Sequence, residues 1–463
     1  MRTLLLALAI TAFGASAQAQ ELTPERAAFR AIYEELVEID SSPTTGSCTR
    51  AAEAMLVHLR GAGFSEQDAR VIVPDGRPDD GNLVAVLRGS SHRAVLLLAH
   101  IDVVDARRED WQRDPFTLVE ENGFFYARGA ADDKSMAAVF VDMLVRMRRE
   151  NYRPRRTIRM ALTCGEETSN RVNGVEYLLN NHREWLQADF AINEGAGGVL
   201  GPDGRPLVFN IQAGEKIHQV ITLTVTNPGG HSSRPVPENA IYRLSRGLDR
   251  LSAHAFPIEL NAVTRAFFER MAPIEGGEIG AAMAAIARNP NDAAAAAVLA
   301  QNPSYNAMMR TTCIATQVEA GHAPNALPQR ATATLSCRVL QTQTAEQVQA
   351  ALREAVADPQ ISVDIVRRRQ GSRAPALTRA IMQPVERTVE RMWPGTPIVP
   401  VMTVGATDGR FLNSAGIPTY GMSGMFSLPG ETNAHGLDEK LRVQSLYEGR
   451  DFLDAIVRLY TQR

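Results

Sequence analysis

The sequence predicts an α/β protein with a mostly parallel sheet and a smaller α+β domain inserted into it. Strand-like and helix-like segments alternate over 20–214, as in a parallel sheet covered by helices. The order of strands and helices changes over 215–370, and the first pattern returns over 371–463. A chain of 463 residues is long enough for two domains. We therefore expect 20–214 and 371–463 to form one domain and 215–370 to form the other.

Two helices are predicted at the start of the first domain. Thr23 can cap a helix over 23–39. Pro24 would then stand in the first turn, where a missing N–H is tolerated.

Apolar and polar side chains alternate over 156–164, which predicts a strand with one apolar face. Periodicity and apolar runs predict further helices at 49–62, 135–149 and 172–182, and strands at 69–73, 82–88, 94–99 and 188–193.

The inserted segment begins with a predicted strand, because residues 217–226 alternate between apolar and polar side chains. An Ala-rich stretch over 256–310 is expected to be mostly helical. The other elements expected in this segment are helices at 237–253 and 344–357 and strands at 311–319, 329–339 and 361–366. The first domain is then expected to resume with a helix at 376–392, strands at 398–402 and 417–420, and a helix at 443–460.

Residues 1–19 have the pattern of a secretory signal peptide. Arg2 precedes an apolar run over 4–13, and small residues follow up to Ala19. The apolar run is too short to span a membrane, and no later segment is long and apolar enough. A net charge of −3 gives no reason to expect a nucleic-acid partner. We expect a secreted or periplasmic protein with no membrane span in its mature chain.

The sequence contains four cysteines, at 48, 164, 313 and 337. An oxidising compartment permits disulfides. Cys313 and Cys337 lie in two predicted strands that flank a turn, so they can face each other across a hairpin. We therefore consider a disulfide between them, with two buried free thiols as the alternative.

Polar side chains follow several predicted strands at the point where each strand ends. His100 and Asp102 stand two residues apart after an apolar strand, so they point to the same face. Taken singly, such a pair is more often structural, and an Asp before a helix is usually a cap. The other candidates are Asp132, Asp133, Glu166, Glu167, Glu194 and His435.

Together these residues predict a metal site. Ligands of open α/β sheets bind at the carboxyl ends of the strands. Two imidazoles with several carboxylates suit Zn²⁺, and Mn²⁺ or Co²⁺ are alternatives. Metal ions would also offset the repulsion between the adjacent carboxylates Glu166 and Glu167, of which one can bind metal while the other acts as a base.

The order of the motifs resembles that of the M20 family of metallopeptidases, which includes aminoacylase-1, carboxypeptidase G2 and the carnosine dipeptidases. The resemblance covers nearly the whole mature chain. The motifs that carry it are HIDVVD at 100–105, GAADDK at 129–134, GEE at 165–167, NEG at 193–195, GGHSSRP at 229–235, GATDGR at 405–410 and HG at 435–436.

This resemblance implies a di-metal hydrolase with two divalent ions. Asp132 would bridge the ions and precede a cis peptide bond to Asp133. Asp102 would orient His100, and Glu166 would be the general base. The implied metal ligands are His100, Asp132, Glu167, Glu194 and His435.

The resemblance also implies that 215–370 is a lid domain carrying the contact of a homodimer. His231 of this domain would reach a substrate oxyanion, often in the partner's site. Substrate-binding positions are matched by Asn325, Arg338 and Arg410. The chain departs from the family pattern at two positions, with Ser135 and Ala406 where glycine is usual, and neither is a proposed ligand.

The predicted reaction is metal-assisted hydrolysis of an amide bond next to a free carboxylate, as in a carboxypeptidase or dipeptidase. An N-acyl-amino-acid amidohydrolase (aminoacylase) on the same scaffold is the alternative. Four methionines of the Ala-rich stretch could line an acyl site, although ordinary helix packing is the commoner role of such residues. The remote alternative is a non-catalytic binding protein. The four methionines are Met271, Met283, Met308 and Met309.

Overall fold

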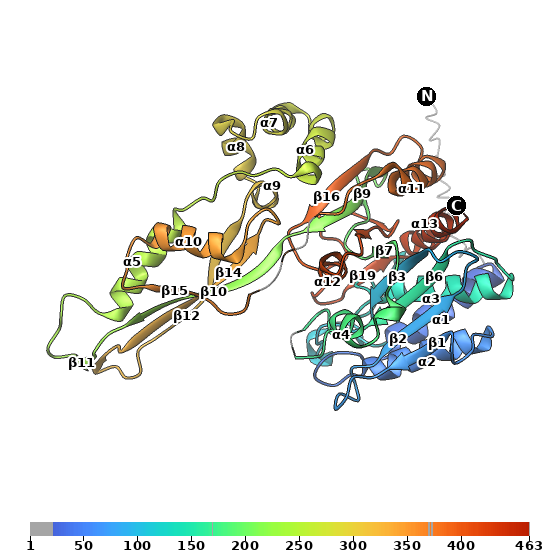
Figure 1. Cartoon of the computed structure of the whole chain (residues 1–463), viewed down its shortest axis with the longest axis horizontal. Coiled ribbons are helices and arrows are strands. Elements are labelled where there is room, and N and C mark those ends of the chain that lie inside the picture. The colour runs from blue at the N-terminus through green and yellow to red at the C-terminus, as the bar shows by residue number, and fades with distance from the viewer. Residues whose placement is uncertain (1–21, 169, 369–370, 372–373, 463) are drawn as a thin grey trace, which may run out of the picture.

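The computed structural model describes residues 22–462, except for 169, 369–370 and 372–373. The predicted signal peptide at 1–19 lies outside the described residues. Figure 1 shows an α/β body around one sheet and a second, elongated part that extends away from it. None of the helices in the described part of the chain combines the length and the hydropathy that crossing a membrane requires.

The α/β body is built on a ten-stranded sheet with the order β1-β2-β6-β3-β7-β17-β9-β8-β18, in which β16 pairs with β9. The central strands β6, β3, β7 and β17 are parallel, whereas β1 and β2 add an antiparallel edge. The mostly parallel central sheet is therefore confirmed. The strands are β1 (Ala69–Ile72), β2 (Asn82–Leu87), β3 (Ala94–His100), β6 (Thr157–Thr163), β7 (Phe190–Asn193), β8 (Gly198–Leu200), β9 (Pro206–Glu215), β16 (Ile398–Thr403), β17 (Thr419–Gly421) and β18 (Phe426–Ser427).

Both faces of this sheet are covered by helices, which explains its uninterrupted apolar strands. In β3, Val95 and Leu97 pack into the core formed with α1, α2, α3, α11 and α13, while Leu96 packs against α4 on the other face. Except for α12, which the sequence did not predict, the helices begin and end close to the predicted positions. They are α1 (Pro24–Glu38), α2 (Cys48–Gly61), α3 (Lys134–Arg149), α4 (Gly174–Asn181), α11 (Arg379–Met392), α12 (Gly409–Ser414) and α13 (Val443–Thr461).

The elongated part contains a four-stranded antiparallel sheet with the order β12-β14-β10-β15. Helices α5 and α10 bury the apolar face of this sheet. Because β9 ends at Glu215 and β10 begins at Ile217, nearly continuous extended chain leads from the first sheet into the second. The elements are α5 (Ala240–Ser252), α10 (Ala345–Val356), β10 (Ile217–Thr226), β12 (Thr312–Ala320), β14 (Arg330–Val339) and β15 (Ser362–Ile365).

The Ala-rich stretch forms four helices that pack on the first sheet. Their core includes Val208 of β9 and Val399 of β16. All four methionines considered for an acyl site are buried in this core, so they serve helix packing. The helices are α6 (Ala262–Glu275), α7 (Gly277–Arg288), α8 (Ala293–Ala300) and α9 (Pro303–Met309).

The protein contains two disulfides. Cys313 and Cys337 face each other across β12 and β14, with a Cα–Cα distance of 4.0 Å, so the hypothesis of a disulfide between them is confirmed. The second bond joins Cys48, the first residue of α2, to Cys164 after β6. Their sequence separation of 116 residues gives no local signal, so this pair was not predicted from the sequence.

A buried carboxyl group lies where the chain leaves the first sheet. Glu215 is 3 % exposed and accepts a hydrogen bond from the backbone N–H of Thr407. Burial raises the pKa of Glu215 to about 7, although the bond from Thr407 opposes this shift. The native protein therefore holds this proton more tightly than the unfolded chain does.

We expect Glu215→Gln to change how stability depends on pH. In the wild type, the stabilisation that comes with the bound proton is complete below about pH 4.5 and is lost as the pH rises through about 7. Glutamine does not ionise, so the variant should gain about 3 kcal/mol over the wild type across this window. Urea unfolding of both proteins at pH 4.5 and pH 8 measures the effect, and a difference that is independent of pH would contradict it.

Candidate metal centre and active site

The carboxyl ends of three adjacent parallel strands bring the predicted ligands together. His100 is the last residue of β3, Glu166 and Glu167 follow β6, and Glu194 follows β7. Strand β3 pairs with both β6 and β7 in parallel, so all three strands end at the same edge of the sheet.

Two imidazoles approach opposite oxygens of Asp132. The Nε2 atom of His100 lies 3.0 Å from Asp132 Oδ1, and the Nε2 atom of His435 lies 3.2 Å from Asp132 Oδ2. His435 Nε2 is also 2.8 Å from Glu167 Oε1. The carboxylate of Asp132 thus lies between the two histidines, in the position that a bridging ligand needs.

The donor set fits divalent cations. Ligand atoms of His100, Asp132 and Glu167 lie within 4.8 Å of one another, and so do those of His100, Glu166 and Glu194. Glu194 Oε2 is 4.0 Å from His100 Nε2. Neutral imidazole and carboxylate are the ligands that zinc and related ions take in proteins.

The electrostatics of the site also favour a cation. Burial raises the pKa of Glu194 well above its usual range, and the charge of Asp132 adds to this rise while His100 opposes it. Burial likewise raises the pKa of Glu166, with Glu194 among the charges that contribute. Buried carboxylates repel each other and resist ionisation, and positive ions between them would reverse both effects.

Asp102 supports the site through two different groups. Its main-chain carbonyl accepts a hydrogen bond from His100 Nδ1 at 3.0 Å, which leaves Nε2 available to bind metal. Its buried carboxylate accepts the backbone N–H groups of Glu166 and Glu167 at 3.3 and 3.0 Å. Asp102 therefore contacts His100 mainly through its backbone, and its side chain holds the two glutamates.

Glu439 holds the loop that carries Asp132. One of its carboxylate oxygens accepts the N–H groups of Ala131 and Asp132 at 2.9 and 3.0 Å, and the other pairs with Arg128 at 2.8 Å. The peptide bond from Asp132 to Asp133 is cis, as the family resemblance implied. Glu439 was missed in the sequence, although it lies only four residues after His435.

Asp408 holds the loop after β6 from the opposite side. Its carboxylate accepts hydrogen bonds from Asn173 Nδ2 and Thr163 Oγ1 at 2.5 and 3.2 Å, and Asn173 also donates to the carbonyl of Gly165. Only Arg410 is singled out from the motif GATDGR by the sequence. The signal that could have identified Asp408 is an acidic residue inside a motif that already carries a functional candidate.

Of the remaining predicted residues, His231, Asn325 and Arg338 belong to the elongated part, whereas Arg410 is in α12 of the α/β body. His231 is exposed on β11 (Gly230–His231), which pairs with β13 (Ala326–Leu327) and so lies beside Asn325. In Figure 1, β11 is at the far end of the elongated part, away from the strand ends that carry the metal-ligand candidates. Arg338 is near enough to Arg410 for the charge of Arg410 to lower its pKa, after the larger effect of burial.

The two departures from the family pattern leave the ligands in place. Ser135 is buried in the first turn of α3, where its hydroxyl donates to the carbonyl of Ala131 at 3.1 Å. It also lines a cavity of about 370 Å³ beside Asp132 and Glu194. Ala406 lies in the loop after β16.

An α/β sheet with His100 and glutamates at its strand ends, joined there by Asp132 and His435 from two loops, is the framework of a metal-dependent hydrolase. Residues 96–459 match the model of peptidase family M20/M25/M40, and the chain belongs to this family. The resemblance inferred from the motifs is thereby confirmed, and the protein is an enzyme of the M20 hydrolase family.

Relatives of the chain include both acyl-amino-acid hydrolases and peptidases. The mouse N-fatty-acyl-amino acid synthase/hydrolase PM20D1 is 29 % identical over 76 % of this chain and 71 % of its own. An M20 family metallo-carboxypeptidase from Sulfolobus solfataricus superposes with a TM-score of 0.68 at 20 % identity, covering 95 % of this chain and 100 % of its own. Human carnosine dipeptidase 1 superposes with a TM-score of 0.63 at 16 % identity, covering 95 % and 97 %.

Proposed function

We propose that the protein is an exported hydrolase that uses two divalent metal ions to cleave an amide bond next to a free carboxylate. The observation that carries this proposal is the arrangement of His100 and His435 on opposite oxygens of Asp132. Glu167 and Glu194 complete the proposed ligand set. Zn²⁺ is the expected ion, with Mn²⁺ or Co²⁺ as alternatives. The disulfides are consistent with export through the predicted signal peptide to a secreted or periplasmic location.

In this proposal, the bound ions supply Lewis-acid activation of water and of the amide carbonyl. Glu166 takes a proton from the attacking water and later delivers it to the leaving nitrogen. Ligand atoms of Glu166, His100 and Glu194 lie within 4.8 Å of one another, so the carboxylate of Glu166 would stand beside the bound ions.

We propose that 215–370 acts as a lid and dimerisation domain. His231 would donate a hydrogen bond to the oxyanion in the partner's site, since it is exposed at the end of the molecule that is remote from its own metal ligands. The edge strand β12 is exposed along most of its length, which leaves its backbone groups free to pair with a second copy.

Two arginines support recognition of the substrate carboxylate. Arg338 lies close enough to Arg410 for the two charges to repel each other. The charge of Arg410 also lowers the pKa of the buried Glu215 and Asp408, against the larger effect of their burial. A carboxylate between the two guanidinium groups would relieve this repulsion. Asn325, beside His231, is the third proposed substrate-binding residue.

The second candidate, an N-acyl-amino-acid amidohydrolase, is favoured by the cavity beside the metal ligands. Its lining includes the apolar side chains of Met136, Val199 and Met425, which suit an acyl chain better than a charged peptide amine. The similarity to PM20D1 also supports this second candidate.

We expect purified mature protein to contain about two divalent ions per chain and to lose amide hydrolysis on chelation. Metal analysis and a panel of dipeptides and N-acyl amino acids, assayed before and after chelation, test this proposal. Preference for N-fatty-acyl amino acids would select the second candidate. Absence of both metal and hydrolysis after addition of Zn²⁺, Mn²⁺ or Co²⁺ would contradict the proposal and favour a non-catalytic binding protein.

A further inference from the structure

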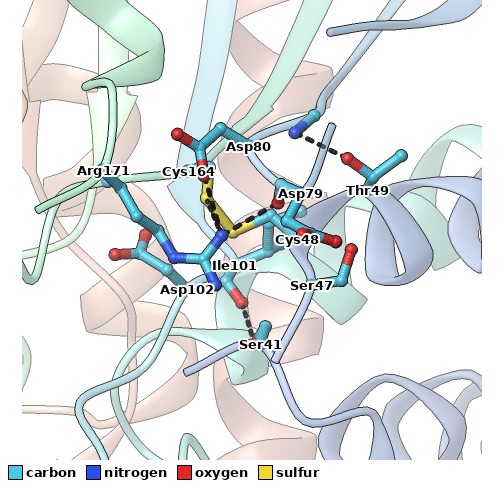
Figure 2. Close-up of a disulfide and its surroundings, with 12 residues drawn as sticks. Ser41, Ser47, Cys48, Thr49, Asp79, Asp80, Ile101, Asp102, Cys164 and Arg171 are labelled. Atoms are coloured by element: carbon cyan, nitrogen blue, oxygen red, sulfur yellow. Dashed lines mark hydrogen bonds and ion pairs between the residues drawn. A yellow bond between two sulfur atoms is a disulfide. The ribbon is translucent and has the colours of Figure 1, made fainter. Parts of the chain in front are cut away.

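The loop between β6 and α4 carries Glu166 and Glu167 and is closed at its base. The backbone N–H of Gly174 donates to the carbonyl of Cys164 at 2.7 Å, so the two ends of the loop meet. Cys164 is in turn bonded to Cys48 at the start of α2. Figure 2 shows this disulfide directly beside Asp102 and Arg171.

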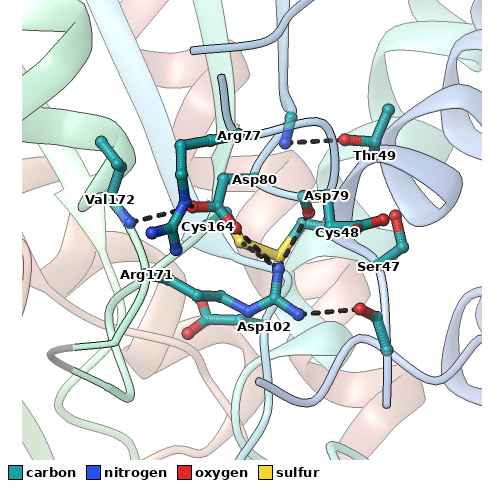
Figure 3. A network of polar contacts seen from close by, with 12 residues as sticks. Ser47, Cys48, Thr49, Arg77, Asp79, Asp80, Asp102, Cys164, Arg171 and Val172 are labelled. Atoms are coloured by element: carbon teal, nitrogen blue, oxygen red, sulfur yellow. Dashed lines mark hydrogen bonds and ion pairs between the residues drawn. A yellow bond between two sulfur atoms is a disulfide. The ribbon is translucent and has the colours of Figure 1, made fainter. Parts of the chain in front are cut away.

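Arg171 fastens the second half of the loop to two other segments of the chain. Its side chain is buried, and Nη1 donates to Asp79 O and Asp80 Oδ1, both at 2.9 Å. Its Nη2 atom donates to the carbonyls of Ser42 and Gly46 at 2.5 and 2.9 Å. Figure 3 shows the guanidinium group lying against the disulfide.

The Arg171–Asp80 ion pair is almost completely buried, with 4 % and 3 % of the two side chains exposed. The second oxygen of Asp80 accepts the backbone N–H of Val172 at 3.0 Å, which fixes the residue after Arg171 as well. The hydrogen bonds of Arg171 Nη1 and Nη2 and of both Asp80 oxygens restrict this pair to one geometry, because a displacement would leave buried charges unpaired.

The segment before α2 that accepts hydrogen bonds from Arg171 also contacts the end of β3, which carries His100. Ser41 Oγ, next to Ser42, donates to the carbonyl of Ile101 at 2.6 Å, between His100 and Asp102. One short segment before α2 therefore contacts both the end of β3 and, through Arg171, the loop after β6 (Figure 2).

We propose that the Cys48–Cys164 disulfide and Arg171 together position the loop so that Glu166 and Glu167 face the metal centre. The inference rests on the proposed function, in which Glu166 is the base and Glu167 a ligand. Adjacent buried carboxylates repel each other and would move apart towards water if the loop were free. The disulfide ties the start of the loop, and Arg171 ties its end.

The first test removes each disulfide in turn. We expect Cys48→Ser/Cys164→Ser to lower kcat about 10–100-fold and to weaken Zn²⁺ binding by a similar factor, as loss of outer-shell support does in other metal sites. Cys313→Ser/Cys337→Ser removes the other disulfide, which joins β12 and β14 of the second sheet, and should leave Zn²⁺ affinity near wild type. Zn²⁺ affinity is measured by competition with a fluorescent chelator.

The second test replaces the guanidinium group. Arg171→Gln and Arg171→Lys both lose this set of four hydrogen bonds, because neither a glutamine amide nor a lysine amine reproduces the guanidinium fork. Both variants should lose kcat and Zn²⁺ affinity to the same extent as Cys48→Ser/Cys164→Ser. Arg60→Gln is the control, because Arg60 likewise donates to two carbonyls, those of Phe64 and Ala69, but lies away from the loop. If the Cys48 and Cys164 variant does not fold, the Arg171 variants decide.

Hydrogen exchange in the loop distinguishes a loss of loop positioning from a loss of overall stability. Hydrogen exchange at the amides of Glu166 and Glu167, which donate to Asp102, should quicken in the Arg171 variants of the folded protein. If these variants have a lower Tm but wild-type kcat, Zn²⁺ affinity and exchange, the inference is overturned while the proposed function stands. If the wild type itself neither binds Zn²⁺ nor hydrolyses the panel, the proposed function fails first.

Discussion

Glu166→Gln is expected to lower kcat about 10²–10⁴-fold, the range that a general base contributes, while metal binding is kept. Glutamine has nearly the shape of glutamate and keeps the backbone N–H that donates to Asp102. It cannot accept and return a proton at neutral pH. Turnover on the best substrate of the panel, together with metal analysis of the same sample, measures the two effects separately.

The neighbouring residue provides the matched control. Glu167→Gln removes a carboxylate from the same loop, but Glu167 lies 2.8 Å from His435, so we expect this variant to lose metal affinity as well as turnover. The distinction matters because Glu166 also lies within ligand distance of His100 and Glu194. Metal loss in Glu166→Gln would make Glu166 a ligand, and near-normal turnover would remove it from the base role.

The elements that the sequence predicted well are those with a strong local pattern. The strand β6 and the helix α13, for example, lie within two residues of their predicted ends, because burial of one face leaves a period of two or 3.6 in the sequence. Residues at the ends of apolar strands were also recognisable, since parallel strands must end together. That rule is sufficient to place His100, Glu167 and Glu194 at one edge of the sheet.

The missed features depend on contacts between distant parts of the chain. Glu439 reaches back 307 residues to the N–H of Asp132, and Cys48 pairs with a cysteine 116 residues away. Neither position carries a local signal, because an acidic residue near a turn is usually solvated. The strand β9 was also missed, although it leads directly to β10 and defines where the elongated part departs.

The position of His231 determines whether one chain can complete its own site. In the structure it lies at the end of the elongated part, with Nδ1 accepting hydrogen bonds from the backbone N–H and the hydroxyl of Ser233. This arrangement leaves Nε2 to donate outward. A residue so far from its own metal ligands can serve catalysis only after a large closure or in a partner's site.

We expect His231→Ala to lower kcat about 10²–10³-fold with unchanged metal content, the usual effect of losing one oxyanion donor. Loss of metal would instead make His231 a ligand. The location of its target is tested by mixing this variant with Glu166→Gln after dissociation and reassembly. If the donor acts across a twofold dimer, half of the dimers are mixed and each has one intact site, which restores roughly a quarter of wild-type turnover. Each variant reassembled alone is the control. A mixture no more active than its components, with mixed dimers shown to form, would place the action of His231 within its own chain.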